Sequence, residues 1–109
     1  MSMDAVFKAL ADPSRRQLLD RLRDKNGQTL NELANGWDMT RQAVTKHLAI
    51  LEAANLVATQ WRGREKLHYL NPVPIHDIAD RWIANFDRAP LAALADLKRD
   101  LESKNGDEK

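Results

Sequence analysis

The chain has 109 residues, of which 43% are hydrophobic and 30% charged, and its formal net charge is +1. This length fits one domain, and the balance of apolar and charged residues is that of a globular rather than a disordered protein. The absence of cysteine excludes a disulfide scaffold, a thiolate zinc site and a cysteine nucleophile, and the absence of a long apolar run or a secretory signal leads us to expect a soluble cytoplasmic protein.

The first part of the chain is predicted to form two short helices. Apolar residues at helical spacing indicate a helix over residues 3–11, and Asp12-Pro13 then opens a second helix over residues 13–25. Aspartate is a preferred N-cap, and proline is tolerated in the first turn because the N–H groups there have no partner within the helix. The charged side chains of the second helix, including Arg15 and Arg21, are expected to form a solvated surface linked by salt bridges.

Two further helices, separated by a short turn, are predicted over residues 29–54. Thr29 and Glu32 have the spacing of a capping box, which places a helix start directly after Thr29. Thr40 has the same capping role for a helix that runs to about Ala54. The buried stripe of this last helix is formed by Val44, Leu48 and Leu51. A short helix, a tight turn and a second helix are the elements of a helix-turn-helix.

A β-hairpin with a basic tip is predicted at residues 56–70. Strand-like runs at residues 56–61 and 66–70 flank the turn Arg62-Gly63-Arg64-Glu65, in which glycine supplies a permissive backbone. Residues 40–70 carry five basic and two acidic side chains, so the positive charge of the chain is concentrated here. A polyanionic partner would select such a local positive field, although a solvated turn with no binding role has the same composition.

The last part of the chain returns to helical spacing of its apolar residues. It predicts helix between residues 75 and 103, which Pro90 either kinks or splits in two, and residues 104–109 are expected to be a flexible tail. The apolar stripe is longer than one small domain can cover, so a homodimer interface is favoured over an ordinary core. The residues expected at that interface are Phe7 and Leu10 of the first helix and Trp82, Ile83, Phe86, Leu94 and Leu97.

The helix at residues 40–54 has the arrangement that a helix needs to enter the major groove of DNA. One face is apolar, and the other is polar with no acidic side chain before Glu52. Arginine and glutamine can form paired hydrogen bonds with base edges, threonine and lysine suit phosphate oxygens, and arginine at a hairpin tip suits a narrow minor groove. The predicted contacts are Thr40, Arg41, Gln42, Thr45, Lys46 and His47 on the helix and Arg62, Gly63 and Arg64 at the hairpin tip.

Three ring side chains near this face have more than one interpretation. His47 lies between the polar and apolar faces, where it either contacts phosphate or caps a neighbouring carbonyl group, and we favour the contact. Trp61, beside the hairpin tip, either packs at the rim of the core or stacks on a sugar. His68, on the second strand, is expected to be structural.

Three segments, in this order, resemble the ArsR/SmtB-type bacterial winged-helix regulators. The opening FKALADPSRRQLLDRL is similar to the first two helices of that family, LNELANGWDMTRQAVTKHLAILEAANLV to its helix-turn-helix, and TQWRGREKLHYLNP to its wing. The similarity covers residues 4–88, and its strongest part is the run Ala-Val-Thr-Lys-His-Leu at residues 43–48.

The resemblance implies a mainly α fold with a small β-hairpin, a winged helix-turn-helix in one domain over residues 1–103. It also implies a homodimer, joined through the first and last helices, that binds a palindromic operator and represses transcription. The family places a histidine at the position of His47, and by the resemblance His47 belongs to the recognition set.

The sequence departs from the metal sensors of this family. Their thiolate motif follows a Glu-Leu pair, whereas here Ala34 and Asn35 follow Glu32-Leu33, so sensing of a soft metal through that site is excluded. A histidine next to an aspartate near a helix start, as at His76-Asp77, is more often capping or solvated than a zinc ligand. We therefore predict no metal and no cofactor.

Other functions stay open from the sequence alone. One is a winged-helix protein-interaction module that never binds DNA, and another is a sensor of a metal or small molecule through a site without cysteine. The sequence has no Gly-rich phosphate loop, no metal-ligand cluster and no nucleophile with an obvious base, so we do not expect an enzyme. The predicted partners are double-stranded DNA, a second copy of the chain and an unknown small-molecule effector, with no membrane.

Overall fold

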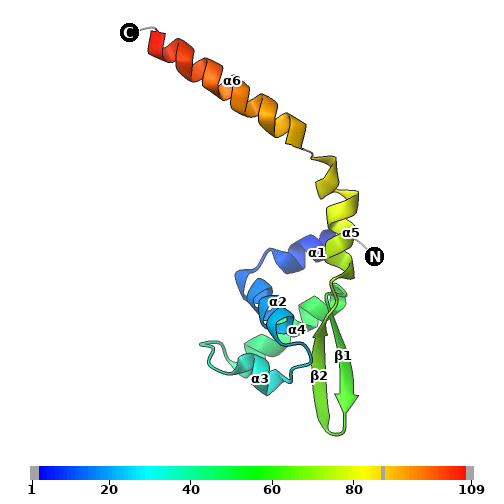
Figure 1. The fold of residues 1–109 in the computed structure, drawn as a ribbon. Coiled ribbons are helices and arrows are strands. Elements are labelled where there is room, and N and C mark those ends of the chain that lie inside the picture. The colour runs from blue at the N-terminus through cyan, green and yellow to red at the C-terminus, as the bar shows by residue number, and fades with distance from the viewer. Residues whose placement is uncertain (1–2, 87, 108–109) are drawn as a thin grey trace. The chain divides into compact units, whose positions relative to one another are not determined.

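The computed structural model describes residues 3–86 and 88–107, and the chain divides into two compact units, residues 1–77 and residues 78–109. The first unit contains four helices followed by a two-stranded sheet and the beginning of a fifth helix (Figure 1). Its elements are α1 (Met3–Leu10), α2 (Pro13–Asp24), α3 (Leu30–Ala34), α4 (Arg41–Ala53), β1 (Val57–Arg62) and β2 (Glu65–Leu70). The predicted mainly α fold with a small β-hairpin is confirmed.

The predicted caps account for where three of the helices begin. Asp12 accepts hydrogen bonds from two backbone N–H groups in the first turn of α2. Thr29 and Glu32 form the capping box at α3, with the Glu32 backbone N–H donating to Thr29 Oγ1 at 3.2 Å and the Thr29 N–H donating to Glu32 Oε1 at 3.1 Å. Thr40 Oγ1 accepts from the Ala43 N–H at 3.0 Å and starts α4. These bonds satisfy N–H groups that the helices leave unpaired.

The core of the first unit is formed by α1, α2, α3 and α4 together with the start of the hairpin. The predicted apolar stripe of α4 is buried, and burying each leucine or valine side chain stabilises the fold by roughly 2 kcal/mol. The largest fully buried side chains are Leu18, Leu22, Leu33, Val44, Leu51 and Leu56. This packing fixes one face of α4 inward and leaves its opposite face available to a partner.

The hairpin is tighter than the sequence predicts. Its antiparallel register runs from Val57 opposite Leu70 to Arg62 opposite Glu65, so the connection has two residues rather than four. Gly63 has a φ of 64°, a left-handed conformation that two-residue hairpin turns require. The strands can therefore pair to their ends, and the basic tip is held by the ladder.

The base of the hairpin is attached to the segment between α2 and α3. The His68 N–H donates to the Gln28 carbonyl at 2.8 Å, and the Gln28 N–H donates back to the His68 carbonyl at 3.1 Å. The Leu70 N–H also donates to Asn26 Oδ1 at 2.8 Å. The segment around Gln28 thereby pairs with β2 through an antiparallel bridge, although Gln28 and His68 are about forty positions apart in the chain.

The C-terminal helices differ from the prediction in where the helix is interrupted. α5 (Val73–Arg81) ends before a 3-10 turn, η1 (Ile83–Asn85), and α6 (Arg88–Asp107) follows. Asn85 Nδ2 donates to the Arg81 carbonyl at 3.2 Å, and such side-chain bonds compete with a continuing helix. The expected continuous helix through Phe86 is therefore wrong. The interruption falls between α5 and α6 rather than at Pro90, which lies inside α6.

Helix α6 contains Pro90 and extends further toward the C-terminus than the sequence predicts. Pro90 is the third residue of this helix, where a missing N–H removes no helical hydrogen bond. The helix continues to Asp107, so residues 104–107 of the expected flexible tail are helical. Residues 108–109 of that tail lie outside the described residues.

Candidate nucleic-acid interface

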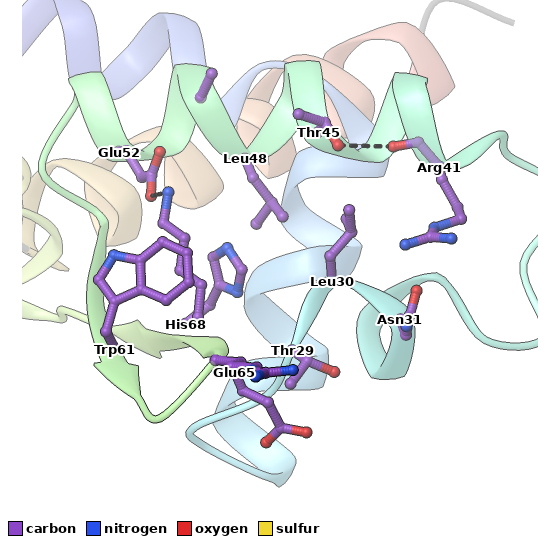
Figure 2. Close-up of a pocket in the computed structure, with 13 residues that line it drawn as sticks. Thr29, Leu30, Asn31, Arg41, Thr45, Leu48, Glu52, Trp61, Glu65 and His68 are labelled. Carbon is purple, nitrogen blue, oxygen red and sulfur yellow. Dashed lines mark hydrogen bonds and ion pairs between the residues drawn. The ribbon is translucent and has the colours of Figure 1, made fainter.

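The polar face of α4 carries most of the predicted DNA contacts. The hydroxyl of Thr45 donates to the Arg41 carbonyl one turn earlier at 2.9 Å, which fixes its rotamer and leaves its oxygen free to accept (Figure 2). No acidic side chain interrupts this face before Glu52, so the face does not repel phosphate. The exposed predicted contacts of this segment are Thr40, Arg41, Gln42, Thr45 and Lys46.

The structure places His47 apart from these five side chains. His47 is half-buried, and its Nδ1 lies 3.4 Å from a guanidinium nitrogen of Arg15 in α2. The same guanidinium donates to the carbonyls of Ala9 at 2.8 Å and Lys8 at 2.9 Å, at the end of α1. His47 therefore faces the junction of α1 and α2, and its contact with DNA stays a prediction.

The expectation of a solvated surface on α2 is wrong for Arg15 and Arg21, whereas Asp20 and Asp24 are exposed and form ion pairs with Arg23. The side chain of Arg15 is only 14% exposed. Arg21 Nη1 donates to the Leu33 carbonyl at 2.7 Å, and its guanidinium lies 4.6 Å from the centre of the Trp37 ring. Short helices leave carbonyl groups unpaired at their ends, and these two arginines supply the missing donors. The short lengths of the first and third helices were the only sequence signal of this role.

The hairpin tip carries further basic side chains. Arg62, Gly63 and Arg64 are all exposed, as predicted contacts must be. Lys66 differs, because its Nζ lies 3.7 Å from Glu52 Oε1 of α4 and its charge is largely compensated. Among the residues that the structure describes, no carboxylate forms an ion pair with the basic side chains Arg41, Lys46, Arg62 and Arg64.

Comparison with known proteins identifies this arrangement. A family model described as a helix-turn-helix domain matches residues 10–60. The chain is 41% identical over 86 residues to the uncharacterised HTH-type transcriptional regulator YuzN of Bacillus subtilis, covering 73% of this chain and 94% of that protein. It is 31% identical over 84 residues to the transcriptional repressor SdpR of the same organism, covering 77% and 91%.

A solved structure agrees with these relatives. The ArsR-like transcriptional regulator from Rhodococcus sp. RHA1 has a TM-score of 0.67 and 32% sequence identity, covering 87% of this chain and 91% of its own. The chain belongs to the ArsR family of transcriptional regulators. This ArsR-family protein is a DNA-binding regulator of transcription, and its β1–β2 hairpin, the wing, matches the winged-helix fold of that family.

The ArsR-family chain also has a cavity that the sequence analysis missed. It has a volume of about 530 Å³, is open to solvent on one side, and is lined by the start of α3, the polar face of α4 and the wing (Figure 2). Trp61, which was expected at the rim of the core or on a sugar, is 66% exposed and lines this cavity. No local pattern predicts the cavity, because its walls come from segments that only the tertiary structure brings together.

Two negative findings apply to the part of the chain that the structure describes. No group of three or more histidine and carboxylate side chains there has the geometry to hold a metal ion, and His76 and Asp77 form no such cluster. No helix in residues 3–86 or 88–107 is long and apolar enough to cross a membrane.

Proposed function

We propose that this regulator is a homodimeric repressor that binds a two-fold symmetric operator. In each protomer, the helix at residues 40–54 lies in a major groove, and the wing at residues 61–66 lies against the neighbouring minor groove. The observation that carries the proposal is a set of exposed basic side chains without a carboxylate partner among the described residues, Arg41 and Lys46 on α4 and Arg62 and Arg64 on the wing, of which Arg41 and Arg64 line the same cavity.

Different side chains on α4 bind different parts of the DNA, base edges or phosphates, according to their chemistry. Arg41 and Gln42 read base edges, because guanidinium and amide groups make paired hydrogen bonds to guanine and adenine. Thr40, Thr45 and Lys46 bind phosphate oxygens and set the register of the helix on the duplex. His47 joins them only if its ring leaves Arg15, and we assign it the weakest contact.

The wing contacts the DNA backbone and the minor groove. Arg62 and Arg64 flank Gly63, whose missing side chain keeps the tip thin. Arginine entering a narrow minor groove gains from the enhanced negative potential there. These contacts add affinity with little dependence on sequence.

The exposed apolar surface of the second unit supports a dimer. Large apolar side chains of this kind rarely stay in water unless they form an interface. On α1, Phe7 and Leu10 are half-buried and join the interface. The exposed members, each between 47% and 65% exposed, are Trp82, Ile83, Phe86, Leu94 and Leu97.

Two-fold symmetry and repression follow from the dimer. Two identical α4 helices meet successive major grooves about one helical turn apart, which requires a palindromic operator. A dimer fixed on DNA blocks transcription of the sequence it covers, and the 31% identical relative SdpR is named a repressor. We place the protein in the cytoplasm, with the DNA.

Operator selection followed by a salt titration tests the DNA contacts. The full chain is used to select duplexes from a random pool, and the affinity of the best duplex is measured at several salt concentrations. We expect a palindrome, and a logarithm of affinity that falls with the logarithm of salt by about 0.9 for each phosphate neutralised. A protein-interaction module would show no selection and a flat response, which would contradict the proposal.

The dimer has its own test. Leu94→Glu with Leu97→Glu places two charges on the exposed face of α6 and should convert the dimer to a monomer in analytical ultracentrifugation. The matched control is Lys98→Glu, a change on the same helix that does not add a charge to the apolar stripe. A wild-type chain that sediments as a monomer at all concentrations would overturn the dimer.

A further inference from the structure

The cavity between α3, α4 and the wing has the composition of a small-molecule site. Its volume of about 530 Å³ lies within the ordinary range for ligand pockets. Leu30 of α3, Leu48 of α4 and the exposed ring of Trp61 provide apolar lining, while Arg41 and Arg64 contribute positive charge. Such sites combine an apolar body with a few polar groups that fix orientation.

The most informative group in the lining is His68. This residue is only 5% exposed, and its Nδ1 lies 2.9 Å from the Gln28 carbonyl oxygen. Because a carbonyl can only accept, Nδ1 carries the hydrogen, and Nε2 of the neutral ring is left as an acceptor. Among the described residues no hydrogen-bond partner of Nε2 is found, and the ring points into the cavity toward Leu48 (Figure 2).

The charges of the lining favour an anion. The lining has three basic side chains, Arg41, Arg64 and Lys66, and two acidic ones, Glu52 and Glu65, so its formal net charge is +1. Glu52 is paired with Lys66 at 3.7 Å, which leaves two arginines against one glutamate. Neither Arg41 nor Arg64 has a carboxylate partner among the described residues. A carboxylate in the cavity would therefore find two uncompensated guanidinium groups, which bind it by charge-assisted hydrogen bonds.

We propose that this cavity binds a small aromatic carboxylate that carries a hydroxyl or N–H donor, and that this ligand releases the protein from DNA. The donor meets His68 Nε2, the aromatic ring packs against Trp61 and Leu48, and the carboxylate pairs with Arg41 and Arg64. The regulatory part rests on the proposed function, because the same two arginines are needed by DNA. A ligand and a duplex that compete for them lower each other's affinity by the same factor.

Direct titration tests the site without DNA. The probe is 6-hydroxy-2-naphthoate, titrated into the full chain by isothermal calorimetry. We expect one probe per protomer with a dissociation constant of about 100 μM or tighter, and about tenfold weaker binding of 6-methoxy-2-naphthoate, which has no donor for His68. No binding up to about 5 mM probe, or equal binding of the two compounds, would overturn the assignment.

Two wing arginines provide a matched pair of variants. Arg64 lines the cavity and Arg62 does not, although both lie beside Gly63 at the tip and both are assigned to DNA. Arg64→Gln should weaken the probe about tenfold, whereas Arg62→Gln should leave its affinity unchanged. Trp61→Ala, at a side chain that is 66% exposed, should also weaken the probe without unfolding the chain. Equal effects of the two arginine variants would contradict the site.

Competition then separates the ligand site from the proposed function. The affinity of the selected duplex is measured with and without saturating probe, and we expect the probe to lower it at least tenfold. A protein that binds DNA but not the probe would refute the site and leave the proposed function intact. A protein that binds the probe but no duplex would refute the proposed function, and simultaneous binding without mutual effect would refute the regulation.

Discussion

Two arginines of α2, Arg15 and Arg21, have environments opposite to those of Arg41 on α4 and Arg64 on the wing, although both pairs look alike in the sequence. Arg15 and Arg21 donate to backbone carbonyls at the ends of α1 and α3, and Arg15 is only 14% exposed. Arg41 and Arg64 are exposed and have no carboxylate partner among the described residues.

The difference teaches that an arginine is available for DNA only where its guanidinium does not donate hydrogen bonds to the carbonyls at a helix end. A short helix offers unpaired carbonyls, and a nearby guanidinium with five donors satisfies several of them at once. α4 is longer, and among the described residues no helix-end carbonyl accepts a hydrogen bond from the side chain of Arg41 or Lys46. The first group of arginines therefore holds the fold together, and the second group is left for a partner.

The largest expected effect that sharpens this comparison is on stability. Arg15→Ala removes the side-chain donor of the Ala9 carbonyl and one of the two donors of the Lys8 carbonyl, which keeps only the Ala11 N–H at 3.3 Å. It should lower the free energy of unfolding by about 3 kcal/mol in urea denaturation. Arg23→Ala is the control on the same helix, because Arg23 is 67% exposed and forms only surface ion pairs, and it should cost less than about 0.5 kcal/mol. Equal losses for both variants would break the comparison.

The next effect is on recognition rather than stability. Arg41→Ala should leave the free energy of unfolding nearly unchanged, because the side chain is exposed and unpaired. It should weaken the selected operator by about 2 kcal/mol and relax the preference at one base pair of each half-site. The measurement is a binding titration against the operator and its single-base variants. A variant that loses stability instead of specificity would mean that Arg41, like Arg15, has a structural role.

A smaller effect is expected at the wing. Arg64→Ala should weaken operator and random duplex almost equally, by about 1 kcal/mol, because its contact is with the backbone or minor groove. The slope of affinity against salt should fall by about 0.9 for each phosphate that the variant no longer neutralises. Binding titrations at several salt concentrations check this, and a change confined to one base pair would mean that Arg64 reads a base edge directly.

The smallest expected effect is at Glu32, the carboxylate partner of the basic side chain of Lys25. The backbone N–H of Thr29, together with the Lys25 side chain, holds the pKa of Glu32 below its usual value of 4.5. A lowered folded-state pKa adds stability above the unfolded value, and that stability is lost as pH falls through the folded one.

Glu32→Gln removes this titration while keeping a side chain that suits a capping box. The difference in free energy of unfolding between the wild type and this variant should be present at neutral pH and shrink as pH falls below 4.5. Denaturation at a series of pH values measures it. A difference that grows toward low pH would contradict the assigned direction.

The sequence predicts those parts of the fold that depend on neighbouring residues. The caps at Asp12, Thr29 and Thr40 and the left-handed turn at Gly63 each need only a few adjacent positions, and the helices and hairpin are observed close to their predicted places. The break after Arg81 was missed because it depends on a side-chain bond from Asn85 within an unbroken apolar pattern.

The candidate site is less predictable, because its geometry depends on distant residues. The exposed face of α4 follows from helical periodicity, but the partners of Arg15 and His47 lie in other helices. The cavity exists because His68 pairs with Gln28, which sets the hairpin against α4. No spacing in the sequence contains that pairing.

The most direct test of the central claim is methylation protection of the selected operator, since guanine N7 lies in the major groove that α4 is proposed to enter. We predict two protected patches about 10 base pairs apart, related by two-fold symmetry, with protection weakened in Arg41→Ala. An operator bound without major-groove protection, or with the same protection in the Arg41→Ala variant, would contradict the account.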